Sequence, residues 1–138
     1  MNNQEEIQYT EDEMYGERLL ISIEADSREL VSNLRAARAI LASFEDVTIM
    51  INAHRIMFGV KNPEYTINNK LGDRKGIMGE GGVTASFKKA KKQGCKIVVI
   101  DLDENIKQVR SFELSKYISM RKADFQNDLI EYCYIVFD

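Results

Sequence analysis

Residues 61–75 read KNPEYTINNKLGDRK and predict the β-hairpin from which the rest of the fold can be worked out. Tyr65-Thr66-Ile67 is a short run with β propensity, and a second run follows at residues 70–73. Between them, Asn68-Asn69 suits a two-residue type I′ turn, because asparagine tolerates a positive φ. Pro63 fits the first residue of a strand, where its missing N–H costs little. We therefore expect an antiparallel pair of strands that turns at these two asparagines.

Helices and strands are predicted on both sides of this hairpin. Before it, residues 27–41 carry apolar side chains at helical spacing, and residues 47–51 form a β-branched run. After it come a short helix at 83–93, a buried strand at 96–100, a helix at 105–119 and a strand at 130–137. This order predicts an α/β (α+β) fold with a mixed sheet of about four to five strands, an αβββαβ core and flanking helices.

The length of 138 residues fits a single domain. Residues 1–16 are polar without a period, so we expect a loosely ordered lead-in before one domain over residues 17–138. No apolar run approaches the ~20 residues that cross a bilayer, and the acidic N-terminus does not resemble a secretory signal. Two cysteines and one histidine are too few for a structural zinc site. A reducing cytoplasm is the expected location, without a membrane partner.

The net charge of −3 is distributed unevenly along the chain. Residues 1–52 carry four basic and eleven acidic side chains, whereas residues 53–96 carry ten basic and three acidic ones. The basic region 53–96 is therefore the expected contact for a nucleic acid, either RNA or DNA. A solvated lysine face on a helix would explain the same charges, so charge alone does not decide between the two interpretations.

A turn at Asn68-Asn69 would place Glu64 directly opposite Asp73. The Cβ atoms of such a pair are only ~5 Å apart, and two facing carboxylates destabilise a sheet unless something compensates. Lys75 lies two residues beyond Asp73 on the same face, with Asn62 opposite it. Glu64, Asp73 and Lys75 are therefore the candidate catalytic residues.

Three arrangements would compensate for the facing acids. A divalent cation such as Mg²⁺ could bridge Glu64 and Asp73, as in metal-dependent nucleases. Lys75 could instead neutralise the pair as a structural ion pair. Alternatively, one acid could hold a raised pKa and act in acid–base catalysis, so that an RNA is cleaved by its own 2′-hydroxyl without a metal. The residues by themselves leave these three arrangements open.

Pro63-Glu64, eight intervening residues and then Asp73-Arg74-Lys75 resemble the PD-(D/E)XK signature of the restriction-endonuclease-like nucleases. A narrower resemblance is to the C-terminal nuclease domains of contact-dependent growth-inhibition toxins and of related phage or mobile-element proteins. It depends on residues 61–75 and on KKAKKQG at 88–94, which an apolar strand follows. Glu64 stands where the signature usually has Asp, and Asn68-Asn69 replaces a turn that contains glycine.

This resemblance implies a restriction-endonuclease-like core and an endonuclease that cleaves RNA, often tRNA, rather than DNA. The resemblance leaves the metal open: Mg²⁺ held by Glu64 and Asp73 is one expectation, and a metal-independent mechanism is the other. The expected substrate contacts are Lys61, Asn62, Arg74, Lys88 and Lys91. His54 and Glu29 are further candidates for acid–base work, although a lone histidine in a loop is more often a bystander.

Two other classes of protein fit the same pattern. One is a non-catalytic binding, immunity or accessory protein on the same fold, whose acidic N-terminal third would face a basic cognate protein. The other is an inactive nuclease remnant, in which Asp73 and Lys75 form only a structural pair.

Overall fold

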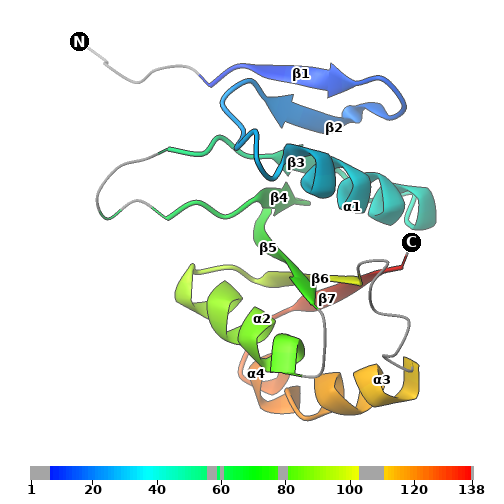
Figure 1. The fold of residues 1–138 in the computed structure, drawn as a ribbon, viewed down its shortest axis with the longest axis vertical. Coiled ribbons are helices and arrows are strands. Elements are labelled where there is room, and N and C mark those ends of the chain that lie inside the picture. The colour runs from blue at the N-terminus through cyan, green and yellow to red at the C-terminus, as the bar shows by residue number, and fades with distance from the viewer. Residues whose placement is uncertain (1–6, 56–58, 60, 78–80, 103–110, 138) are drawn as a thin grey trace.

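The computed structural model describes residues 7–55, 59, 61–77, 81–102 and 111–137. These residues contain a mixed sheet of seven strands, whose order in space is their order along the chain (Figure 1). The strands are β1 (Tyr9–Asp12), β2 (Gly16–Ser22), β3 (Ile49–Ile51), β4 (Tyr65–Ile67), β5 (Lys70–Ile77), β6 (Ile97–Leu102) and β7 (Tyr132–Phe137). Three neighbouring pairs are antiparallel, β1/β2, β3/β4 and β4/β5, and the other three are parallel.

Four helices in the described residues pack on the two faces of this sheet. They are α1 (Leu30–Ser43), α2 (Gly81–Lys92), α3 (Ser111–Ser119) and α4 (Lys122–Gln126). α1 covers one face, where Ala37 and Ile49 belong to one buried apolar cluster. The other three helices lie on the side of β5, β6 and β7 in Figure 1, where Phe87 and Leu114 belong to a second cluster. None of these helices is long and apolar enough to cross a membrane.

β6 contributes side chains to both apolar clusters. Ile97 and Val99 point into the cluster under α1, and Val98 and Ile100 point into the cluster under α2 and α3. Successive residues of a strand face opposite sides of the sheet, so a strand covered on both faces needs an unbroken apolar run. The predicted buried strand at residues 96–100 is thereby confirmed.

The predicted α/β class and mixed sheet are confirmed, but the expected number of strands was too low. The order helix, three strands, helix, strand occurs as α1, β3, β4, β5, α2 and β6. The additional strands are β1 and β2, and β1 lies inside the stretch that was expected to be a loose lead-in. β1 reads YTED and lies at an edge of the sheet, where polar residues are tolerated, so it lacks an apolar alternation.

The β4–β5 hairpin has the predicted register and the predicted turn. Its residue pairs are Tyr65–Gly72, Thr66–Leu71 and Ile67–Lys70. Asn68 and Asn69 have φ angles of 47° and 67°, as a type I′ turn requires. The side-chain oxygen of Asn68 also accepts a hydrogen bond of 2.9 Å from the backbone N–H of Thr48, which ties the turn to the start of β3.

β5 leaves β4 after three residue pairs. It remains paired with β6 over six residues, from Gly72 to Ile77. Beyond Gly72, β5 therefore has no ladder partner among the described residues on its β4 side. The sheet forks at this point, with α1 beside one branch and α2 beside the other (Figure 1).

We expect Asn69→Ala to destabilise the protein by about 1–2 kcal/mol, because alanine lacks the tolerance of asparagine for a left-handed backbone. Asn69→Gly is the matched control and should keep or raise the free energy of unfolding, since glycine adopts a positive φ without strain. Urea denaturation of the three proteins measures the difference. Equal stability of the alanine and glycine variants would show that the turn does not need a positive φ at this residue.

Candidate functional site

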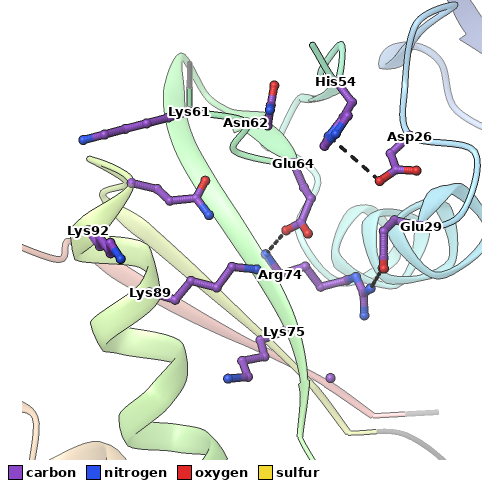
Figure 2. A pocket seen from close by; sticks show the side chains of 12 residues that line it. Asp26, Glu29, His54, Lys61, Asn62, Glu64, Arg74, Lys75, Lys89 and Lys92 are labelled. Atoms are coloured by element: carbon purple, nitrogen blue, oxygen red, sulfur yellow. Dashed lines mark hydrogen bonds and ion pairs between the residues drawn. The ribbon is translucent and has the colours of Figure 1, made fainter. Parts of the chain in front are cut away.

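A cavity of about 750 Å³ lies in the fork of the sheet (Figure 2). Its walls come from the start of α1, the loop between β3 and β4, the free side of β5 and the end of α2. The cavity brings together most of the residues that the sequence predicted for the site. Those that line it are Lys61, Asn62, Glu64, Arg74 and Lys75, together with His54 and Glu29.

Glu64 and Asp73 are close neighbours, although the β4–β5 ladder ends one residue pair before them, at Tyr65–Gly72. Asp73 is 2% exposed, and neither of its carboxylate oxygens has a hydrogen-bond donor among the described residues. Glu64 lines the cavity, and its Oε2 accepts a hydrogen bond of 2.6 Å from the backbone N–H of Arg74. That N–H is available because β5 has already left β4 at this residue. The fork therefore creates the donor that holds Glu64 in place.

Burial raises the pKa of Glu64 to about 8, and the neighbouring charge of Asp73 adds to the rise. The hydrogen bond from Arg74 N–H acts in the opposite direction but is a smaller effect. A carboxyl group with this pKa keeps its proton at neutral pH while the cavity is empty. A protonated Glu64 can share a hydrogen bond with Asp73 and avoids the repulsion that two facing carboxylates would have.

Lysines give the cavity its positive charge. Lys61, Lys75, Lys89 and Lys92 line it, and Nζ of Lys89 lies 3.5 Å from Oδ2 of Asp73. Lys75 stands on the same side of β5 as α2 in Figure 2, two residues beyond Asp73. All four lysines belong to the basic region 53–96.

The face of α2 that borders the cavity differs from the one expected. Lys88 and Lys91 are not among the residues that line it, and Lys91 pairs instead with Asp124 at 2.8 Å. Lys89 and Lys92, three residues apart on one side of the helix, take the expected place. The apolar residues of α2 predict which side of the helix is buried. They do not predict which lysines face the cavity, because that also depends on where β5 lies beside the helix.

Arg74 has its own partners on the opposite face of the sheet. It is 8% exposed, and its guanidinium donates to Asn33 Oδ1 at 2.6 Å, Asp101 Oδ2 at 3.0 Å and Glu29 Oε2 at 2.7 Å. Asp101 is 1% exposed and also pairs with Arg35 at 2.5 Å. These contacts join α1 to β5 and β6. Arg74, an expected substrate contact, thus donates within the protein.

Asn62 and His54 shape the loop side of the cavity. The side-chain amide of Asn62 accepts from Arg55 N–H and donates to Arg55 O, each at 2.9 Å. It therefore bridges the two ends of the loop. Nδ1 of His54 lies 3.9 Å from Asp26, on the α1 side of the cavity (Figure 2).

The acid pair fits a Mg²⁺ ion in the number and kind of its ligands. Mg²⁺ in phosphoryl-transfer sites is usually held by one or two carboxylates, with water and phosphate oxygens completing the shell. Asp73 lies behind the cavity lining and offers two buried oxygens that accept from no N–H group of the described residues, and Glu64 adds a second carboxyl group that lines the cavity. No cluster of three His, Cys, Asp or Glu side chains suited to a metal occurs in the described part of the chain.

Comparison with protein-family models, with curated proteins and with solved structures finds no match for this chain. Function is therefore inferred from the geometry of the cavity and from the resemblance of residues 61–75 to the PD-(D/E)XK signature.

We expect Arg74→Met to lower the free energy of unfolding by about 3–5 kcal/mol, because it leaves the buried carboxylate of Asp101 with one cation fewer. Arg28→Met is the matched control. Arg28 pairs with Asp26 at the surface with 78% of its side chain exposed, and such pairs are worth about 1 kcal/mol or less. Urea denaturation of both variants measures the contrast, and equal losses would contradict the structural role of Arg74.

The stability of the protein should fall as pH rises between about 5 and 8, because of Glu64. Its pKa is about 8 in the folded protein and near 4.5 when unfolded, so the folded state binds the extra proton within this window. The slope from one such group is at most about 1.4 kcal/mol per pH unit. Glu64→Gln should remove this part of the pH dependence, whereas Glu45→Gln on the exposed surface should not. Parallel curves for wild type and Glu64→Gln would disprove the raised pKa.

Proposed function

We propose that the protein is a nucleic-acid phosphodiesterase whose site is the cavity in the fork. The observation that carries this proposal is the pairing of Glu64 with Asp73, a buried carboxylate without a hydrogen-bond donor, beside a cavity that four lysines line. Such a pair is costly to maintain without a cation or a proton. A row of ammonium groups beside it suits a substrate that carries several phosphates.

The sequence of elements supports a restriction-endonuclease-like core. An antiparallel meander of β3, β4 and β5 follows α1, and α2 then leads to β6, which is parallel to β5. Of the signature residues, Pro63-Glu64 directly precede β4, and Asp73-Arg74-Lys75 lie on β5. The two acids of this signature are neighbours at the point where the sheet forks.

Each residue then has a role that follows from its place. Glu64 and Asp73 would hold Mg²⁺, which activates water as a nucleophile and stabilises charge on the phosphate. Lys75 would orient the scissile phosphate or the attacking water, because it lies on the same face of β5 as Asp73. Lys61, Lys89 and Lys92 would contact neighbouring phosphates. Asn62 acts indirectly, because its amide holds the loop that carries Lys61.

RNA, and tRNA in particular, is the proposed substrate class, on the strength of the likeness to toxin nuclease domains. A toxin-type nuclease would also need a cognate protein that protects its host. The alternative mechanism without a metal, in which Glu64 serves as the acid and the RNA supplies its own 2′-hydroxyl, belongs to the same substrate class. The two mechanisms differ in their response to chelators and in their products.

Purified protein should cleave tRNA when Mg²⁺ is present, and EDTA should stop the reaction. Asp73→Asn should lower the rate by at least about 100-fold, because it removes a negative charge from the site while keeping the shape of the side chain. Asp46→Asn, on an exposed loop after α1, is the control and should cleave normally.

Cleavage that continues in EDTA and leaves 2′,3′-cyclic phosphate ends would support the metal-independent form of the proposal. Intact tRNA, RNA and DNA in every fraction, together with healthy cells at high expression, would count against a phosphodiesterase and in favour of a binding protein on the same fold.

A further inference from the structure

The carboxylate of Asp73 has an unusual environment for a buried anion. It is 2% exposed, no N–H group of the described residues donates to either oxygen, and the neighbouring carboxyl group of Glu64 can donate to it only when protonated. Buried charges are normally paired and hydrogen-bonded, because an isolated one is strongly disfavoured. In the described part of the chain, the one cation within ion-pair distance of Asp73 is the ammonium group of Lys89, at 3.5 Å.

Lys89 is a side chain that can leave this position easily. Its side chain is 44% exposed and extends from α2 along the cavity wall (Figure 2). The 3.5 Å separation exceeds the 2.7–2.9 Å typical of a charge-assisted hydrogen bond, so attraction between the charges is the main contribution. A long lysine stem has several rotamers, so its ammonium group is not confined to one position.

Lys75 does not take this role, although it stands on the same face of β5 as Asp73. No carboxylate of the described residues lies within ion-pair distance of its ammonium group. Among the described residues, Lys89 thus pairs with the buried acid, whereas Lys75 has no carboxylate within ion-pair distance.

We infer that Lys89 occupies the cation position at Asp73 while the cavity is empty and gives it up when a divalent cation binds. The freed ammonium group is then available to a phosphate of the nucleic acid. Lys89 is thus a positioning residue that couples the two ligands: bound nucleic acid draws Lys89 away from Asp73 and tightens cation binding, and the bound cation tightens nucleic-acid binding. This inference rests on the proposed function and adds a coupling between the cation and the nucleic acid.

The coupling must be reciprocal, because it is a free energy shared between two sites. An ammonium group 3.5 Å from a carboxylate oxygen repels an incoming divalent cation at short range. Couplings of this kind usually change affinity by about 5- to 150-fold, and screening at the open side of the cavity favours the lower part of that range.

The test measures Mn²⁺ binding to the whole protein by calorimetry, without any substrate. Lys89→Met should bind Mn²⁺ about 5- to 20-fold more tightly than wild type, because the competing charge is gone. Lys89→Arg, which keeps the charge, should not gain affinity. Lys122→Met, on the exposed surface of α4, is the matched control for removing one positive charge. Circular dichroism confirms that each variant is folded.

A second titration adds a 12-nucleotide 2′-O-methyl RNA, which lacks a free 2′-hydroxyl. The oligonucleotide should tighten Mn²⁺ binding to wild type by about 5-fold or more and should add no comparable gain in Lys89→Met. Unchanged or weaker Mn²⁺ binding in Lys89→Met would overturn the inference, as would an equal gain from the oligonucleotide in both proteins.

These outcomes are separate from the test of the proposed function. Absence of Mn²⁺ binding at millimolar concentration in all variants would overturn the role of Lys89, while tRNA cleavage in EDTA would still support a phosphodiesterase. Conversely, tighter cation binding in Lys89→Met would support the role of Lys89 even if none of the nucleic acids tested were cleaved.

Discussion

The buried guanidinium of Arg74 is the contact on which the geometry of the fork depends. Its side chain joins Asn33 and Glu29 of the α1 segment to Asp101 of β6, and its backbone N–H holds Glu64 on the other side. β5 has lost its partner β4 at this residue, so no sheet ladder fixes that side of the strand. One residue therefore supports the strand and orients Glu64, the acid of the pair that lines the cavity.

The cavity is positively charged although the chain as a whole is acidic. Two of the acids in its wall are already engaged, Asp26 by Arg28 and Glu29 by Arg74. The Arg28 guanidinium beside Asp26 holds the pKa of that carboxyl below its usual range. Glu64 keeps a proton at neutral pH in the empty cavity, which leaves the charges of the lysines in excess. Local pairing, rather than net charge, decides the sign of the surface that a ligand meets.

The hairpin could be predicted from sequence because it depends on local chemistry: two asparagines at positive φ fix the register, and the register brings Glu64 to Asp73. Lys89 could not be predicted, because the choice among four neighbouring lysines depends on how α2 is rotated against β5. The partners of Arg74 were equally hidden, since Asn33 and Asp101 are distant in sequence. β1 escaped detection because an edge strand needs no apolar alternation.

The width of the cavity depends on the two apolar clusters as well as on its lining residues. The wall near α1 is packed on one cluster and the wall formed by α2 on the other, and β6 contributes to both. Repacking around Phe87 would shift the α2 wall relative to the α1 wall, and so change the width of the opening, without replacing any residue that a ligand touches. Substitutions in one apolar cluster can thus alter which ligands the cavity accepts. Homologues with identical lining residues therefore need not bind the same ligands.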